Sequence, residues 1–329
     1  MNVVKHVSAE PLVDLMQGCD RWEVKVGEHG LVALVDIMPR LVPANRTADI
    51  AIVQAARTST GKGAKSPGED RGLIRYLYSH MHTSPFEMVN VKFHHVLPIF
   101  VARQLIRHRT ASVNEYSLRY AQPKDRFWFP HASQLRTQST SNKQVTNGSV
   151  DLNMAENFID VLEDTSREAM QEYQTAIAAG IGREQARTIL PLNLFTEWFW
   201  EIDLKNLLGF LGLRQDKHAQ AEIRVYADAM YDLLKTLVPD ALEAYDDYHP
   251  NRLGMSLSRM DIEALNPKCT PTRILELFSS NRELLEFTEK ARRIGNDSAV
   301  EMAELGMFIR SGESADTAPQ HEQLARMPA

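Results

Sequence analysis

Strand-like hydrophobic periods are concentrated in the first part of this chain, and that distribution restricts the fold strongly. Within the first 120 of its 329 residues, residues 23–26, 31–38 and 89–96 alternate or run continuously apolar, as strands do. Later in the chain, apolar residues recur every three or four positions, as on one face of a helix. The pattern predicts an α+β fold, with a central antiparallel or mixed sheet from the N-terminal half packed with long helices from the C-terminal half.

Turn and cap signals give the predicted limits of the elements. Gly27 and Gly30 join the first two runs into a hairpin, and a helix starts after Pro98. Further helical segments are predicted around residues 49–57, 69–82, 151–179, 183–190, 198–213, 220–238, 272–293 and 299–310. Residues 137–149 contain mostly small polar side chains and are expected to form a loop, and the polar residues after 311 are expected to be disordered.

Composition argues against several classes of protein. A hydrophobic fraction of 43% suffices for a core, and the net charge of −6 disfavours nonspecific binding to nucleic acid or to an anionic membrane. No run approaches the length of a membrane span, and no basic and apolar leader is visible. The two cysteines, Cys19 and Cys269, match no metal-ligand or redox spacing, which indicates a reducing compartment, by default the cytoplasm.

Residues 104–120 carry the densest chemistry of the chain, with four arginine or histidine side chains, one glutamate and two serines. The helix predicted after Pro98 ends in the basic residues, and a period of two follows, with one apolar face made by Tyr116, Leu118 and Tyr120. Arginine offers phosphate a planar fork of donors, and Ser and Gln add neutral hydrogen bonds. The segment is therefore predicted to bind an anion with several oxygens. The alternative is a solvated basic turn whose charges pair with acidic neighbours.

Other catalytic patterns are weak or missing. No glycine triplet follows a strand with dinucleotide-binding spacing, and no phosphate loop is present, so side chains must hold any nucleotide. No metal is predicted, because ligand spacing and a recurring acidic partner are missing around the candidate histidines His80, His82, His94 and His95. A hydrolase is disfavoured, because Ser112 and Ser117 near His108 lie in no Gly-x-Ser-x-Gly elbow.

The motif Arg107-His108-Arg109, followed after seven residues by Ser117, resembles the signature of the flavin-dependent thymidylate synthases. Three more segments are similar to that family: His82-Thr-Ser84-Pro85-Phe86-Glu87, Arg187-Thr-Ile-Leu-Pro-Leu-Asn193 and Leu213-Arg214-Gln-Asp216-Lys-His218-Ala219-Gln220-Ala-Glu222. The resemblance covers residues 32–248, about two thirds of the chain. It implies a catalytic domain over residues 1–250 and a helical C-terminal extension over residues 251–329.

The resemblance also implies an activity and a set of site residues. The enzyme would make dTMP from dUMP with 5,10-methylenetetrahydrofolate, FAD and NADPH, with hydride from reduced flavin and without a cysteine nucleophile. It would be a homotetramer with shared active sites. The residues implied to contact FAD are Ser84, Arg107, His108, Arg109, Glu115, Asp203 and Lys205. The residues implied around dUMP are Gln104, Arg107, Glu115, Tyr116, Ser117, Leu118, Arg119, Arg187 and Arg214.

The resemblance to the family implies that Arg214 is the catalytic residue. Its positive charge would lie against the uracil ring and stabilise negative charge that develops at N3 and at O2 or O4, making the ring a better carbon nucleophile. Gly209 departs from the family, which often has a side chain that meets the flavin at this position.

Two other functions fit parts of the sequence. A nucleotide- or RNA-binding module would use the arginines for phosphates and Tyr116 and Tyr120 as stacking platforms. Steep salt dependence of binding to single strands would distinguish it. A flavin enzyme that acts on a nucleotide other than dUMP would carry the same motifs.

Overall fold

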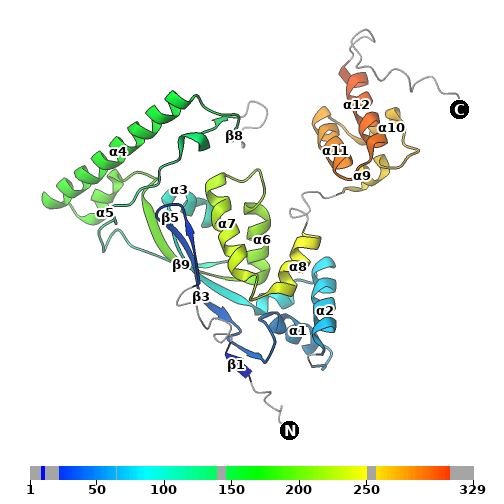
Figure 1. Ribbon diagram of the computed structural model, residues 1–329, viewed down its shortest axis with the longest axis horizontal. Helices are drawn as coiled ribbons and strands as arrows, with labels where there is room; N and C mark the ends of the chain where they lie inside the picture. The colour runs from blue at the N-terminus through cyan, green and yellow to red at the C-terminus, as the bar shows by residue number, and fades with distance from the viewer. Residues whose placement is uncertain (1–8, 12–21, 64, 139–145, 250–256, 312–329) are drawn as a thin grey trace. The chain divides into compact units, whose positions relative to one another are not determined.

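The computed structural model describes residues 9–11, 22–63, 65–138, 146–249 and 257–311. The chain divides into two compact units, Met1–Leu253 and Gly254–Ala329, and both are drawn in Figure 1. Among the described elements, the first unit holds every strand and the second contains only helices. The tail predicted to be disordered and Cys19 lie outside the described residues.

A five-stranded antiparallel sheet forms the centre of the first unit (Figure 1). Its strands lie in the order β2 (Glu23–Val26), β3 (Gly30–Met38), β5 (Asn90–Pro98), β9 (Phe195–Asp203) and β6 (Ser112–Glu115). The predicted hairpin is confirmed, because β2 and β3 pair antiparallel across a tight turn. Gly27 in this turn has a φ of +63°, which glycine adopts without strain. The strand predicted over residues 89–96 is β5.

Two small antiparallel pairs lie outside the main sheet. They are β1 (Ala9–Pro11) with β4 (Leu41–Pro43), and β7 (Thr137–Gln138) with β8 (Thr146–Asn147). The loop predicted over residues 137–149 is thus closed by two paired residues at each end, and its central residues 139–145 lie outside the described part.

The helix predicted over residues 198–213 is wrong in its first part, because β9 occupies it. This strand lies between β5 and β6 and pairs with both. Its buried residues Trp198, Trp200 and Ile202 recur at every second position, which is the period of a strand. The helical period begins only with helix α6 (Leu204–Arg214). The sheet therefore takes a central strand from the second half of the chain, and strands are not confined to the first 120 residues.

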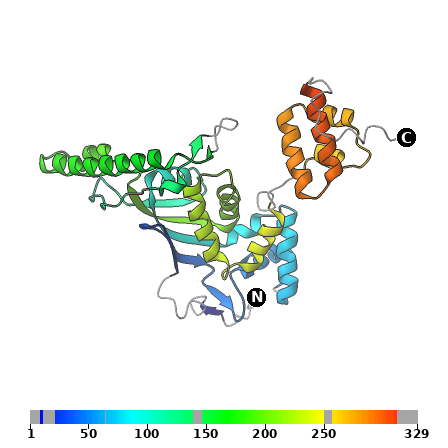
Figure 2. The ribbon, with the colours of Figure 1, turned by 45° about the horizontal axis from the view of Figure 1, so that its top comes forward.

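Helices pack against this sheet, and α6 and α7 lie side by side over one of its faces (Figures 1 and 2). Most predicted helices of the first unit are confirmed within a few residues. The remaining helices are α1 (Asp49–Thr58), α2 (Pro67–Ser79), α3 (Ile99–Leu105), α4 (Leu152–Ala178), α5 (Arg183–Ala186), α7 (Ala221–Leu234) and α8 (Pro239–Tyr248), with the 3-10 helices η2 (Ser84–Met88), η3 (Ala132–Gln134) and η4 (Arg187–Ile189).

Residues 104–120 fold differently from their prediction. Helix α3 ends at Leu105, so the Arg-His-Arg motif lies in the turn that follows it. The extended part is β6, which ends at Glu115, and the residues after it leave the sheet. Tyr120 is 76% exposed whereas Tyr116 and Leu118 are half-buried, so the predicted single apolar face does not form. The pairing of β6 with β9 covers Ser112–Glu115 and ends before the apolar residues of the predicted alternation.

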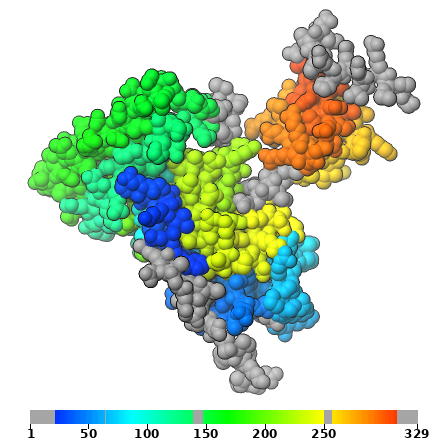
Figure 3. Space-filling model, viewed as in Figure 1, coloured from blue at the N-terminus to red at the C-terminus, as the bar shows by residue number. Residues whose placement is uncertain are grey.

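Helix α4 is confirmed, but its apolar stripe does not enter the core. Asp151 caps the helix by accepting a hydrogen bond from the backbone N–H of Met154 at 3.2 Å. Met154, Phe158 and Val161 are 65%, 51% and 64% exposed. The helix forms a ridge on the surface of its unit, which is visible in Figure 3. Burial on α4 is concentrated further along, around Tyr173.

The second unit has its own small core. Its helices are α9 (Arg259–Ala264), α10 (Pro271–Leu277), α11 (Asn281–Arg293) and α12 (Asp297–Ser311). Phe278 and Phe287 stack at its centre with ring centroids 5.0 Å apart. The buried carboxylate of Asp261 pairs with Nζ of Lys290 at 2.7 Å and so joins α9 to α11.

His95 in β5 makes the stability of the first unit depend on pH. The side chain is fully buried, and its Nδ1 accepts a hydrogen bond from Nε1 of Trp198 at 3.1 Å. Burial, with a smaller contribution from His94, lowers the pKa of His95 from 6.5 to about 3. Between these values the unfolded chain binds a proton that the folded chain does not, so stability must fall as the pH falls through this window.

We expect His95 to contribute up to about 1.4 kcal/mol to this loss for each pH unit below its unfolded pKa. Urea unfolding at pH 7, 6 and 5 measures the slope. The His95→Gln variant is expected to lose less stability over the same range, whatever its stability at pH 7. Equal slopes for the two proteins would assign the dependence to other groups.

Candidate active site

Arg214 and His108 meet although they lie 106 residues apart in sequence. Arg214 ends α6, and His108 lies in the turn after α3. Nε of Arg214 donates a hydrogen bond to Nε2 of His108 at 3.1 Å. The imidazole also packs edge-on against Phe210, with ring centroids 4.8 Å apart. The fold thus joins the residue predicted to be catalytic to one predicted to contact the flavin.

This contact determines the tautomer of His108, and burial of the ring is the main reason that it is neutral. Because Nε2 accepts the hydrogen bond, the neutral imidazole carries its proton on Nδ1. Burial, together with the charge of Arg214, lowers the pKa of His108 to about 4, so the ring is neutral at pH 7. Burial also lowers the pKa of Arg214, which nevertheless stays cationic at neutral pH. Since Nε is engaged, the two terminal nitrogens of Arg214 are the groups that remain for a planar ligand.

Arg107 and Arg109 flank this histidine in the same turn. Both side chains are exposed, and no carboxylate in the described part of the chain pairs with either of them. Two guanidinium groups beside the Nδ1–H donor of His108 form a set of donors suited to phosphate oxygens. The chemistry of these residues therefore fits a cofactor that carries phosphates.

Arg119 and Arg187 are brought together by Glu184. Nη2 of Arg119 lies 3.3 Å from Oε2 of Glu184, and Nε of Arg187 donates to the backbone carbonyl of Glu184 at 3.3 Å. Both arginines are exposed, and the Arg119 guanidinium lies over the Tyr120 ring, 5.6 Å from its centroid. Sequence reasoning missed Glu184, although its position three residues before Arg187 on a short helix was a signal.

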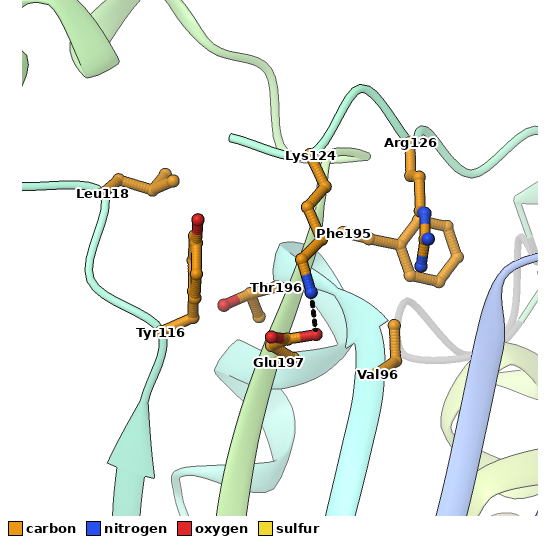
Figure 4. Close-up of a pocket in the computed structure, with 8 residues that line it drawn as sticks. All are labelled: Val96, Tyr116, Leu118, Lys124, Arg126, Phe195, Thr196 and Glu197. Carbon is orange, nitrogen blue, oxygen red and sulfur yellow. Dashed lines mark hydrogen bonds and ion pairs between the residues drawn. The ribbon is translucent and has the colours of Figure 1, made fainter. Parts of the chain in front are cut away.

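Tyr116, which follows Glu115 at the end of β6, borders an open recess at one end of β9 (Figure 4). Oε1 of Glu115 accepts a hydrogen bond from the Thr196 hydroxyl at 2.7 Å. Figure 4 shows Lys124 reaching down to Glu197, and the ion pair measures 2.7 Å. The recess is lined by Val96, Tyr116, Leu118, Lys124, Arg126, Phe195, Thr196 and Glu197. Lys124, Arg126, Thr196 and Glu197 were not anticipated, because no local motif marks them.

The other predicted substrate residues have local partners. Ser117 accepts a hydrogen bond on Oγ from the backbone N–H of Arg119 at 3.3 Å, which shapes the turn after β6. The Gln104 side chain donates a hydrogen bond to the side chain of Gln220 at the start of α7. These contacts hold Ser117 in the turn after β6 and join Gln104 to the start of α7.

Three predicted flavin residues lie around the start of α6. Asp203 caps this helix by accepting a hydrogen bond from the backbone N–H of Asn206 at 2.9 Å. Nζ of Lys205 lies 3.1 Å from Oε1 of Glu87. Glu87 lies on the 3-10 helix that begins at Ser84. Within the described residues, no hydrogen bond or ion pair joins this group to the arginines. Gly209 is exposed, and a Cβ there would meet nothing within 4 Å.

The described part of the chain offers little for other kinds of site. No group of three or more His, Cys, Asp or Glu side chains found there could hold a metal ion. None of the helices described is long and apolar enough to cross a membrane. Burial raises the pKa of the Cys269 thiol.

Comparisons with known proteins agree with this geometry. The chain matches the family model described as "Thymidylate synthase complementing protein" over residues 40–240. A flavin-dependent thymidylate synthase from Dictyostelium discoideum is 50% identical over 276 residues, which cover 83% of this chain and 90% of the relative. One from Rickettsia bellii (strain RML369-C) is 42% identical over 281 residues, covering 81% and 92%.

A solved structure shares the fold of the first unit. The UMP/dUMP methylase PolB from Streptomyces cacaoi, bound with 5-Br dUMP, superposes with a TM-score of 0.60 and 31% identity over 68% of this chain and 98% of that chain. The fold and the arginine-rich site define an enzyme of the methyltransferase class. Within that class, the chain belongs to the flavin-dependent thymidylate synthase family.

Proposed function

We propose that this enzyme catalyses the reductive methylation of dUMP to dTMP, with 5,10-methylenetetrahydrofolate as the carbon donor, FAD as the cofactor and NADPH as the reductant. The observation that carries the proposal is the hydrogen bond between Arg214 and His108, which joins two separate family motifs into one site. Relatives that are 50% and 42% identical are named flavin-dependent thymidylate synthases, which supports the flavin and the product of this proposal.

The turn after α3 would hold the FAD. Arg107 and Arg109 would bind its phosphates, and the Nδ1–H of His108 would add a neutral donor. Lys205 would approach from the start of α6 and Ser84 from the start of η2. Asp203 would support Lys205 as the cap of α6, and Glu115 would accept a hydrogen bond. When bound and reduced, the flavin supplies hydride for the new methyl group.

The nucleotide would lie beside Arg119 and Arg187. Their charges suit the phosphate of dUMP, which would take over the ion pair that Arg119 makes with Glu184. The sugar and base would lie among Gln104, Arg107, Glu115, Tyr116, Ser117 and Leu118. Replacing the Glu184 carboxylate by the phosphate would cost little free energy, because the ion pair of Arg119 and Glu184 is exposed to solvent.

Arg214 would activate the base. Its terminal nitrogens would donate to the uracil edge, where negative charge develops at N3 and at O2 or O4, and carbon 5 would become nucleophilic. The neutral His108 does not offset the positive charge of Arg214. It binds only Nε, so the terminal nitrogens are left for the substrate. A proton would then leave carbon 5 after that carbon bonds to the one-carbon unit.

No cysteine nucleophile is part of this proposal. Burial raises the pKa of the Cys269 thiol, which reduces its thiolate fraction. Cys269 also belongs to the second compact unit, whereas the site residues belong to the first.

The absorption spectrum and a tritium assay test the proposal. Purified protein should show a flavin spectrum, and it should release tritium from carbon 5 of labelled dUMP only when FAD, NADPH and methylenetetrahydrofolate are present. UMP is the second substrate to test, because the similar protein PolB is named as a UMP/dUMP methylase. No release from either nucleotide, or flavin-independent binding of RNA with steep salt dependence, would contradict the proposal.

A homotetramer with shared sites is also proposed, and the apolar stripe of α4 supports it. A stripe of exposed Met154, Phe158 and Val161 is costly to leave in water. We expect Phe158→Glu to shift the protein toward smaller species in sedimentation velocity. Asn153→Glu adds the same charge at an exposed position that is not at i+3 or i+4 spacing from the stripe, and it should leave the tetramer intact. A Phe158→Glu protein with unchanged mass would exclude α4 from the interface.

A further inference from the structure

The last turn of α6, which carries Arg214, contacts the end of α8. A Cβ at Gly212 would lie 2.1 Å from Cε1 and 2.6 Å from Nε2 of His249. Atoms this close overlap, so the imidazole fills the space that a side chain at position 212 would need. We call this space the Gly212 notch. Gly212 lies two residues before Arg214, on the same helical turn.

His249 is held in the notch by its own surroundings. It caps α8, and its backbone N–H donates to the carbonyl of Tyr245 at 2.9 Å. Its ring lies against the ring of Tyr245, with centroids 4.9 Å apart. Tyr245 is fully buried, and its hydroxyl donates to Oε1 of Gln215 at 3.2 Å. Since Gln215 follows Arg214 directly, α8 contacts α6 on both sides of the arginine in sequence.

The other glycine of α6 shows that the notch is specific. Gly209 is exposed, and a Cβ there would touch nothing within 4 Å. A glycine within a helix costs about 1 kcal/mol relative to alanine. At Gly212 packing offsets that cost, because the absence of a side chain lets the ring of His249 pack directly against the helix.

We propose that His249, seated in the Gly212 notch, is a positioning residue for Arg214. The ring sets the depth and rotation of the last turn of α6, so that Nε of Arg214 reaches His108 and the terminal nitrogens face the substrate. A helix turn moves as a rigid body, so a displacement at position 212 is transmitted to position 214. The inference rests on the proposed function, because it assumes that Arg214 activates the base.

A double-mutant cycle in the full-length enzyme tests the inference. Gly212→Ala should lower kcat for tritium release from dUMP about tenfold or more, with a smaller change in KM, because the added methyl group collides with the ring. In a His249→Ala background the same substitution should change kcat by less than about twofold, because the methyl group enters the vacated space.

Thermal unfolding supplies the control. Gly209→Ala should raise Tm through helix propensity, whereas Gly212→Ala should not. Wild-type kcat in Gly212→Ala, or the same loss in both backgrounds, would overturn the role of His249 while leaving the proposed function intact. An inactive wild-type enzyme with all cosubstrates present would instead overturn the proposed function, and the positioning role would fail with it.

Discussion

Replacement of Arg214 by alanine is expected to lower tritium release from dUMP by about 10²–10³-fold, while FAD remains bound. The guanidinium is the charge that would stabilise the developing anion of the base, and it acts in a half-buried position where water screens it poorly. Its Nε is anchored by His108 at 3.1 Å, so the remaining donors are oriented before substrate arrives.

The matched control is Arg214→Lys, which keeps the charge but removes the planar fork and the Nε–H donor. We expect it to retain part of the activity and to exceed Arg214→Ala clearly. Flavin absorbance, measured on both variants, separates loss of chemistry from loss of cofactor. If Arg214→Ala released tritium at the wild-type rate with FAD bound, Arg214 would have no role in activating the base.

Replacement of Asp70 by alanine is expected to destabilise the first unit by about 3–5 kcal/mol. The Asp70 carboxylate on α2 is buried and bonds to Nη1 of Arg57 on α1, and it pairs with Nη1 of Arg46 at 2.9 Å. Arg57 is only 8% exposed, so removal of the carboxylate would leave a buried cation without its partner. Urea unfolding at pH 7, followed by far-UV circular dichroism, measures the change.

The control is Asp232→Ala, which removes an exposed partner of Lys235 on the surface of α7. Such pairs contribute less than about 1 kcal/mol, so its unfolding midpoint should stay close to that of the wild type. Equal midpoints for Asp70→Ala and the wild type would show that the arginines find other partners or water when the carboxylate is gone.

Much of the fold could be predicted from local patterns. The hairpin of β2 and β3 followed from a glycine turn between two apolar runs, and α4 followed from its helical period, which begins at Asp151. Strand β9 was missed because its aromatic alternation runs directly into the leucines of α6, so a single helical period was assigned to both. Its partners, β5 and β6, decide its conformation, and they lie far away in sequence.

The residue types of the candidate site were also readable in advance. The motif spacing identified Arg107, His108 and Arg109, and the late motif identified Arg214, because these segments resemble the signature of the family. The motifs did not indicate which atoms meet. They did not show that Nε2 of His108 accepts a hydrogen bond from Arg214, or that burial keeps the ring neutral.

The amino-acid sequence alone determined most of the elements, the family resemblance and the side chains that can bind phosphate and stabilise an anion, because these depend on local periods and on motif spacing. Only the tertiary structure decided that Arg214 lies on His108, that Glu184 joins Arg119 to Arg187, and that His249 fills the space at Gly212. These contacts join residues from separate elements. They form where β9 inserts into the sheet and α6 packs over it, and no local pattern encodes that packing.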